Sequence, residues 1–252
     1  ASNYNRFTGW SGGGCSGTGT CTVTMDAIKT VTAGFEPATF ADVPFSYSET
    51  LGGINYPLHD YIEALWDGGY TAGCSTNPLM YCPGTILDRA QAAVFMLRGQ
   101  RGTGYVPPPE PWNTFADDWL SLPDISYAQK WAEGMWQEGL TAGCQNNPVL
   151  LYCPRSQLPR VEASVFGLRL KYGAAYGTPD QPGTPPPATG TLFADMTDVN
   201  YWGTKWAEQA YLDGLLPNCG TQGGKPLYCP DDIVDRAWAA YLIVKAKNLP
   251  LP

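Results

Sequence analysis

Histidine, charge of either sign and long apolar runs are all scarce in this chain of 252 residues. Only 15% of the residues are charged, and 23 acidic residues against 15 basic ones give a formal charge of -8. This balance leaves no surplus of positive charge to bind a nucleic-acid backbone or an anionic membrane surface. No apolar run approaches the roughly 20 residues that a membrane span needs. We therefore expect no nucleic-acid partner and no membrane span.

The single histidine, His59, limits the catalytic chemistry that the chain can support. A Ser-His-Asp or Cys-His triad would have to use it. The stretch Gly9–Gly13 has the G-x-S-x-G spelling of a nucleophile elbow, but the glycine-rich sequence after it cannot form the helix that an elbow requires. Adjacent carboxylates such as Asp117 and Asp118 diverge and cannot flank one bond. The sequence predicts no enzyme and no cofactor, and His59 is interpreted as a surface or capping residue.

The eight cysteines occur as four close pairs with long cysteine-free stretches between them. None of the pairs has the C-x2-4-C spacing of zinc knuckles, whereas a disulfide readily closes a loop of this size. Free thiols and a metal site are the alternatives, and Asp195 and Asp198 form a weak calcium pattern. Disulfides are favoured, no metal site is expected, and disulfides imply an oxidising compartment. The expected pairs are Cys15–Cys21, Cys74–Cys82, Cys144–Cys153 and Cys219–Cys229.

Comparison of the chain with itself shows three copies of one pattern. Each copy contains a Phe-Ala-Asp tripeptide, a stretch rich in tryptophan or tyrosine, a cysteine pair that ends in Tyr-Cys-Pro, and an arginine that opens an apolar stretch. Two proline-rich segments without hydrophobic periodicity lie between the copies and are interpreted as extended linkers. The predicted units are a β segment at 1–38, repeats at 39–104, 112–176 and 191–252, and linkers at 105–111 and 177–190.

Each copy is expected to fold as a helix, a disulfide loop and a second helix. Apolar residues recur at i, i+3 and i+4 around Tyr61–Trp66 and Trp131–Trp136, which predicts the first helix. A second apolar face follows each arginine, and Asp88 and Asp235 are the predicted N-caps of that helix in copies one and three. One helix pair cannot bury both apolar faces, so we expect the three copies to share a core.

The N-terminal stretch has a different pattern. Thr20–Met25 and Thr30–Phe35 alternate and are rich in β-branched residues, which predicts a hairpin with its turn near Asp26. A lone hairpin is marginal in water, so this segment needs neighbours. The chain has no initiating methionine and no signal-like segment, and Ala1 is interpreted as a processed or truncated start.

The three copies resemble the S-layer homology (SLH) family. The Phe-x-Asp-Val start of that family matches Phe40–Val43, its arginine element matches Asp88–Gln91, and the resemblance covers about residues 40–249. It implies a mainly α fold in which three helix-loop-helix repeats form a pseudo-threefold helical spindle, with a small N-terminal β segment. It also implies binding of acidic, often pyruvylated, cell-wall polysaccharide in grooves between repeats. Residues 9–35 resemble the closing strands of a glycine-rich β repeat of bacterial surface proteins.

The arginine of each copy is the candidate anion ligand. It is placed at a predicted helix start, where free N–H groups favour an anion, and its guanidinium offers a bidentate fork to a carboxylate. The alternative is that each arginine pairs internally with the aspartate of a Phe-Ala-Asp tripeptide. Tryptophans in the less periodic sequence are candidates for stacking on a sugar ring. The candidate glycan-binding residues are Arg89, Arg160, Arg236, Asp42, Asp117, Asp195, Trp112, Trp119 and Trp202.

The middle copy is expected to be the strongest anion site. Asp88 and Asp235 precede the arginines of the other two copies, and as N-caps they would occupy the helix N–H groups and oppose a ligand carboxylate. Arg160 follows a proline instead and keeps Glu162 in the family position. A ligand carboxylate would therefore meet the least opposition at Arg160.

Two functions of different classes are predicted. The first is a non-catalytic cell-surface module that anchors a surface protein to acidic or pyruvylated cell-wall polysaccharide. The alternative is a self-assembling structural protein of an extracellular lattice or filament, a homo-oligomer in which the N-terminal β segment completes a neighbouring subunit. Both place the chain outside the cell, at a bacterial cell surface.

Overall fold

The computed structural model describes residues 4–252, so the interpretation of Ala1 as a processed or truncated start lies outside the described residues. Over this range it has six α-helices and four small antiparallel sheets, with 29% of the chain helical and 17% in strands. The expectation of a mainly α fold built as a pseudo-threefold helical spindle is therefore wrong, and the class is mixed α and β. The physical reason is that much of the chain between the short helices forms hairpins and irregular loops.

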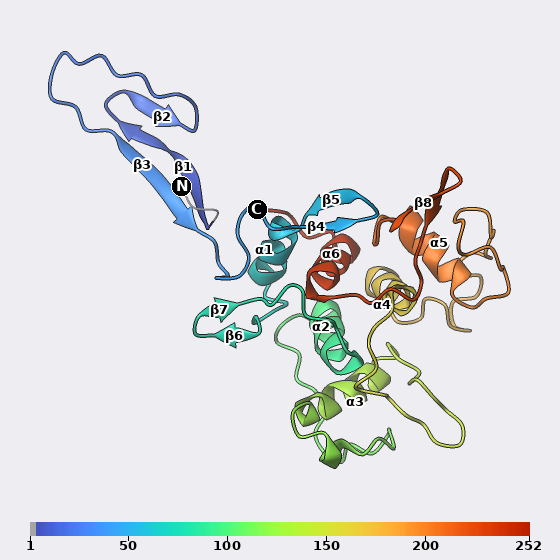
Figure 1. Cartoon of the computed structure of the whole chain (residues 1–252). Helices are drawn as coiled ribbons and strands as arrows, with labels where there is room; N and C mark the ends of the chain where they lie inside the picture. The colour runs from blue at the N-terminus through green and yellow to red at the C-terminus, as the bar shows by residue number, and fades with distance from the viewer. Residues whose placement is uncertain (1–3) are drawn as a thin grey trace.

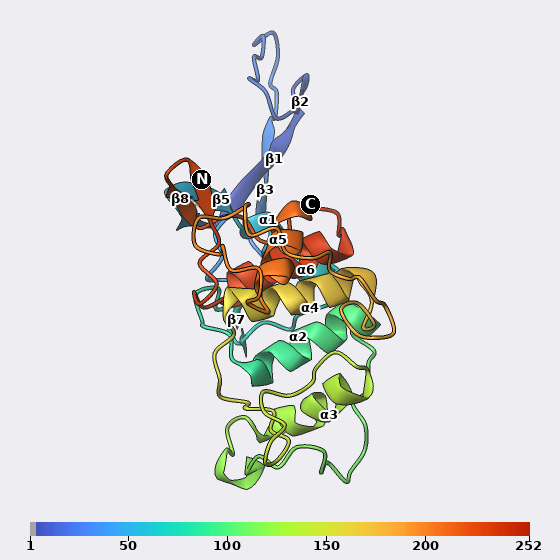
Figure 2. The same ribbon diagram turned by 90° about the vertical axis from the view of Figure 1, so that its right-hand side faces the viewer.

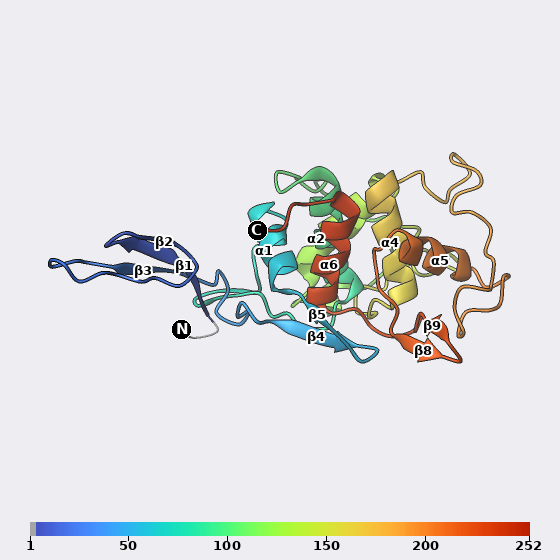
Figure 3. The same cartoon turned by 90° about the horizontal axis from the view of Figure 1, so that it is seen from above.

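An antiparallel three-stranded sheet precedes the repeats and projects away from the helices (Figure 1, Figure 3). Its order is β2-β1-β3, with β1 at Asn5–Gly12, β2 at Cys15–Gly17 and β3 at Thr32–Pro37. The predicted strand at Thr30–Phe35 corresponds to β3, but the predicted strand at Thr20–Met25 is wrong. The partner of β3 is β1, and residues 20–25 lie in the long loop between β2 and β3.

The repeats supply pairs of helices where the apolar patterns predict them. Asp88 and Asp235 cap the second helices as expected, because their carboxylates accept the N–H groups of Gln91 at 2.8 Å and Trp238 at 3.0 Å. The helices are α1 at His59–Asp67 and α2 at Arg89–Arg101, α3 at Gln129–Gln137 and α4 at Arg160–Tyr172, and α5 at Thr204–Leu212 and α6 at Arg236–Lys247.

Short hairpins and single turns fill the spaces between these helices. Residues 105–111 and 177–190, the proline-rich segments, contain neither helix nor strand. One hairpin, β4 at Ser48–Leu51 with β5 at Ile54–Pro57, precedes α1 and has no counterpart in the other repeats. The remaining elements are β6 at Ser75–Thr76, β7 at Leu79–Met80, β8 at Gly220–Gln222, β9 at Lys225–Leu227 and the 3-10 turns Trp119–Ser121 and Ser126–Ala128.

Helices from different repeats pack on one another and share one core. The first helix of each repeat contacts the second helix of another repeat: α1 contacts α6, α3 contacts α2, and α5 contacts α4. Figure 2 shows α6, α4, α2 and α3 in successive layers. Gly167 permits the close approach of α4 and α6, because a Cβ there would lie 2.6 Å from Leu242. The largest cluster of buried apolar side chains accordingly draws on all three repeats.

All four predicted disulfides are present, and no described cysteine is free. In each repeat the second cysteine of the pair has a positive φ, 56° at Cys82, 57° at Cys153 and 52° at Cys229. Four disulfides indicate an oxidising compartment and are consistent with a secreted protein. None of the described helices is long and apolar enough to cross a membrane.

Candidate functional site

The three repeat arginines join neighbouring repeats. Each is the first residue of a second helix and is at least 93% buried. Each guanidinium lies over a fully buried tyrosine ring, with its central carbon 4.8 to 5.1 Å from the ring centroid. Its Nε donates to the carbonyl of that tyrosine. The bonds are Arg89 to Tyr152 at 2.9 Å, Arg160 to Tyr228 at 2.9 Å and Arg236 to Tyr81 at 2.8 Å, so they link repeats one to two, two to three and three to one.

The aspartates of the Phe-Ala-Asp tripeptides do not pair with these arginines among the described residues. Both oxygens of each carboxylate instead accept backbone N–H groups of the Tyr-Cys turn, where the cysteine has its positive φ. The interpretation of internal Arg-Asp pairs is therefore wrong, because the turn's free N–H groups are the closer partners. Asp42 binds Tyr81 and Cys82, Asp117 binds Tyr152 and Cys153, and Asp195 binds Tyr228 and Cys229.

The three candidate stacking tryptophans lie in different surroundings. Trp119 is 4% exposed and stacks on Tyr152, so protein covers the ring that was expected to meet a sugar. Trp112 is half-buried, and its Nε1 donates to the carbonyl of Pro108 at 2.8 Å. Trp202 is 49% exposed and lines a cavity. Of the three, Trp202 has the geometry for stacking on a ligand.

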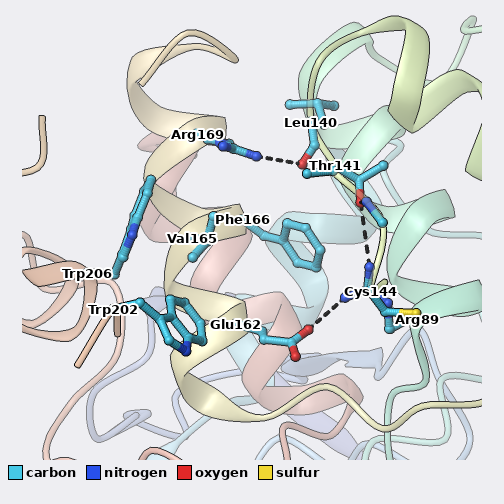
Figure 4. Close-up of a pocket in the computed structure, with 12 residues that line it drawn as sticks. Arg89, Leu140, Thr141, Cys144, Glu162, Val165, Phe166, Arg169, Trp202 and Trp206 are labelled. Carbon is cyan, nitrogen blue, oxygen red and sulfur yellow. Dashed lines mark hydrogen bonds and ion pairs between the residues drawn. The ribbon is translucent and has the colours of Figure 1, made fainter. Parts of the chain in front are cut away.

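The cavity at Trp202, called groove A here, holds about 360 Å³ between the three repeats. The ion pair between Arg89 Nη1 and Glu162, 2.6 Å apart, lines it, and Trp202 lies across the cavity from Thr141 and Arg89 (Figure 4). Arg169 lines the same cavity and donates from Nη1 to the carbonyl of Leu140 at 3.2 Å. Burial lowers the pKa of Arg169. The lining residues are Arg89, Leu140–Cys144, Glu162, Val165, Phe166, Arg169, Trp202 and Trp206.

A second cavity, groove B, is built from the equivalent residues one repeat earlier and holds about 180 Å³. Gln91 replaces Glu162, so no carboxylate lines it. Three of its polar atoms are buried without a hydrogen-bond partner among the described residues: Gln91 Oε1, Arg98 Nε and Arg236 Nη2. Burial lowers the pKa of Arg236. The lining residues are Tyr70, Thr71, Ala72, Gly73, Gln91, Val94, Phe95, Arg98, Tyr127 and Arg236.

The third equivalent position, around Arg160, is filled by protein. Trp238 stands where Gln91 and Glu162 stand in the other repeats, is 7% exposed, and packs edge-on against Tyr56 of β5 with ring centroids 5.3 Å apart. A guanidinium nitrogen of Arg160 also donates to the carbonyl of Pro217. The structure therefore argues against Arg160 as the strongest anion site. Asp88 and Asp235 are N-caps as expected, but the space around the arginine decides its access to a ligand.

Two groups of metal-ligand type are explained without a metal. Asp42 with Cys74 and Cys82, and Asp195 with Cys219 and Cys229, place ligand atoms within 4.8 Å of one another. The sulfurs of each group are bonded to each other, and the carboxylates accept backbone N–H groups. Asp198, the other member of the weak calcium pattern, accepts the N–H of Asn200 at 2.8 Å.

Sequence reasoning missed Arg98 and Arg169, which line the two grooves. Their signal is an i, i+7 pattern on the second helix, in which a polar residue, Gln91 or Glu162, precedes the arginine on the same face. His59 is also misassigned: it is 3% exposed and not a surface residue.

No protein-family model matches the chain, and no curated protein sequence matches it. Any functional assignment therefore rests on the chemistry of grooves A and B and on the repeat pattern. In both grooves that chemistry combines guanidinium groups with aromatic rings.

Proposed function

We propose that this chain is a non-catalytic cell-surface module that binds acidic or pyruvylated cell-wall polysaccharide in grooves A and B and so anchors a surface protein. The observation that carries the proposal is the charge of groove B. Arg98 and Arg236 both line it, no carboxylate is among its described lining residues, and neither arginine forms an ion pair among the described residues. Two guanidinium groups without a neutralising carboxylate attract an anion, and a ligand carboxylate forms charge-assisted hydrogen bonds with such groups.

Groove A supports binding of a sugar ring beside the acidic group. Of its two arginines, Arg89 is paired with Glu162 and Arg169 donates to the carbonyl of Leu140, while Trp202 presents an exposed indole. A flat aromatic ring suits the apolar face of a pyranose. Groove A therefore favours a neutral sugar, and groove B favours the acidic one.

The resemblance to the SLH family supports the same proposal. The arginines that carry this resemblance line the two open grooves at Arg89 and Arg236. The disulfides are consistent with a secreted protein, and the proposal places it at a bacterial cell surface. The only carboxylate among the two linings, Glu162, is bound to Arg89, which favours a binding role over acid-base catalysis.

Calorimetric titration with pyruvylated cell-wall polysaccharide, and with the same material stripped of pyruvate, tests the proposal. We expect Arg98→Gln to weaken binding of the pyruvylated form by about 10- to 150-fold, because it loses a charge-assisted bond of about 1.5 to 3 kcal/mol. Gln91→Glu should also weaken it, because it gives groove B the neutralising carboxylate that groove A already has. The reciprocal change Glu162→Gln should strengthen anion binding in groove A by freeing Arg89.

Arg101→Gln is the matched control, because Arg101 lies on the same helix as Arg98 but is 54% exposed in its side chain and pairs with Glu138 outside both grooves. The Arg101→Gln variant should bind pyruvylated polysaccharide with the same affinity as the unsubstituted chain. Equal affinity for pyruvylated and stripped polysaccharide would remove the carboxylate mechanism. If the Arg98→Gln and Gln91→Glu variants both bind pyruvylated polysaccharide as tightly as the unsubstituted chain, groove B is not the binding site.

A second candidate function, a self-assembling lattice or filament, is favoured by the N-terminal sheet. This sheet projects from the helices, and the outer edge of β3 pairs with no described strand (Figure 1). Phe35 on that strand is 51% exposed. An open strand edge can be completed by a strand of a second copy. Electron microscopy at high protein concentration should then show polymers of the full chain and none of a chain without residues 1–37; monomers of both would reject this candidate.

A further inference from the structure

Groove B contains an aromatic ring that a ligand can reach. The aromatic residues that line it are Tyr70, Phe95 and Tyr127. Phe95 is 6% exposed and lies beneath Arg236, whose guanidinium carbon is 5.0 Å from the ring centroid. The ring of Tyr70 lies against Gly68, where an added Cβ would be 2.6 Å from it. Tyr127, in contrast, is 48% exposed, so its ring is the one that is open to a ligand.

Tyr127 occupies in groove B the place that Trp202 occupies in groove A. Tyr127 lies two residues before α3, in a 3-10 turn that contacts α2, and Trp202 lies two residues before α5. In both repeats the tryptophan four residues later lies beneath an arginine of a second helix. The pairs, measured from guanidinium carbon to ring centroid, are Arg98 over Trp131 at 5.5 Å and Arg169 over Trp206 at 5.8 Å. The two exposed rings are therefore held by the same framework.

The filled position around Arg160 has the framework without the exposed ring. Tyr61, the third residue of α1, lies beneath Lys245, whose Nζ is 5.6 Å from the ring centroid. Two residues before α1 the chain has Pro57, which offers no aromatic ring. Among the three repeats, a cation over a ring is therefore common to all, whereas the ring before the helix accompanies the two open grooves. This difference assigns Tyr127 and Trp202 to the ligand and not to the fold.

The charge around Tyr127 is compatible with an acidic ligand. Burial raises the pKa of Tyr127, the charge of Asp88 adds to the rise, and the charge of Arg236 opposes it. The hydroxyl therefore keeps its proton at neutral pH and brings no negative charge into groove B. Because Arg236 acts on this hydroxyl, the ring lies beside one of the two guanidinium groups that attract a ligand carboxylate.

We propose that groove B selects a single acidic pyranose residue, whose carboxylate binds Arg98 and Arg236 while its ring stacks on Tyr127; this inference rests on the proposed function. Groove B holds about 180 Å³, and sites for drug-sized ligands hold roughly 300 to 1,000 Å³, so its size suits one sugar residue. An aromatic ring suits the apolar face of a pyranose, and a guanidinium suits a carboxylate. Tyr127 is then the residue that distinguishes an acidic sugar from a free carboxylic acid.

NMR titrations of the full chain, with its disulfides intact, test this inference with methyl β-D-glucuronide, sodium pyruvate and methyl β-D-glucoside. The glucuronide carries both the ring and the carboxylate, so we expect it to bind more tightly than the other two probes. Tyr127→Ala should weaken glucuronide binding by about tenfold and leave pyruvate binding unchanged, because pyruvate has no sugar ring to stack. Tyr127→Phe keeps the aromatic ring and should bind the glucuronide within about twofold of the unsubstituted chain.

Trp202→Ala is the matched control, since it removes the equivalent ring of groove A and should leave glucuronide affinity unchanged. Unchanged glucuronide affinity in Tyr127→Ala, or an equal loss in Tyr127→Phe, would overturn the inference. A loss of pyruvate binding as large as that of the glucuronide would also overturn it, because a general disturbance of groove B weakens both probes. If Arg98→Gln weakens polysaccharide binding while Tyr127→Ala leaves glucuronide binding intact, the proposed function stands and this inference fails. If the unsubstituted chain binds neither the polysaccharide nor the glucuronide, the proposed function itself fails.

Discussion

Replacing Tyr152 by alanine is expected to lower the free energy of unfolding by about 3 to 5 kcal/mol, the range for removing a buried aromatic ring. Tyr152 is fully buried, its hydroxyl donates to the carbonyl of Arg89 at 2.8 Å, and its own carbonyl accepts the Nε of Arg89. The ring therefore holds the first repeat against the second. Chemical denaturation of the oxidised chain measures the change, and we expect one cooperative transition, because all three repeats share the core.

Two further substitutions separate the contributions of the ring and the hydroxyl. Tyr152→Phe keeps the ring and should cost about 1 kcal/mol, the net value of one hydrogen bond. Tyr127→Ala removes a tyrosine that is 48% exposed and should cost less than Tyr152→Ala. A loss below about 1 kcal/mol in Tyr152→Ala, or a second repeat that unfolds in a separate transition, would show that this contact does not hold the repeats together.

Local features of the sequence predict the helices well and the strands poorly. The apolar face of α1 and the capping aspartates of α2 and α6 are encoded within a few residues, so pattern alone finds them. The strand β1 at Asn5–Gly12 contains two glycines and no β-branched alternation, and it becomes a strand through its pairing with β3. The hairpins in the cysteine loops have strands of two or three residues, which are too short to show a period.

The same division applies to the candidate site. Repetition identifies Arg89, Arg160 and Arg236, but their partners are tyrosine carbonyls of other repeats, a tertiary contact that no spacing within one copy encodes. The covering of Arg160 depends on Trp238 and on the hairpin β4–β5, which only the first repeat contains. Three copies with the same arginine therefore give two open grooves and one filled position.

Asp235 is expected to make the free energy of unfolding decrease as the pH rises from about 4 to about 7. Burial raises the pKa of Asp235 to about 7, and the nearby Glu49 carboxylate contributes to the rise. An aspartate in the unfolded chain has a pKa of about 3.9. Between these values the folded chain keeps a proton that the unfolded chain has released, so the free energy of unfolding decreases with pH and levels off above about 7. Because the carboxyl is partly solvated, the resulting loss of unfolding free energy is on the order of 2 kcal/mol.

Asp235→Asn should remove this pH dependence, because asparagine still accepts the N–H of Trp238 as an N-cap but carries no charge beside Glu49. At pH 8 the variant should be about 2 kcal/mol more stable than the unsubstituted chain, and at pH 4 the two should be equal. Asp88→Asn is the matched control, because it changes the equivalent cap of α2. Burial raises the pKa of Asp88 as well, but the hydrogen bond from the Gln91 N–H and the charge of Arg155 oppose the rise, so its gain at pH 8 should be smaller. Denaturation curves at pH 4, 6 and 8 measure both variants. An Asp235→Asn chain that is less stable than the unsubstituted one at pH 8 would show that the carboxylate is charged and stabilising as a cap, and that Glu49 does not oppose it.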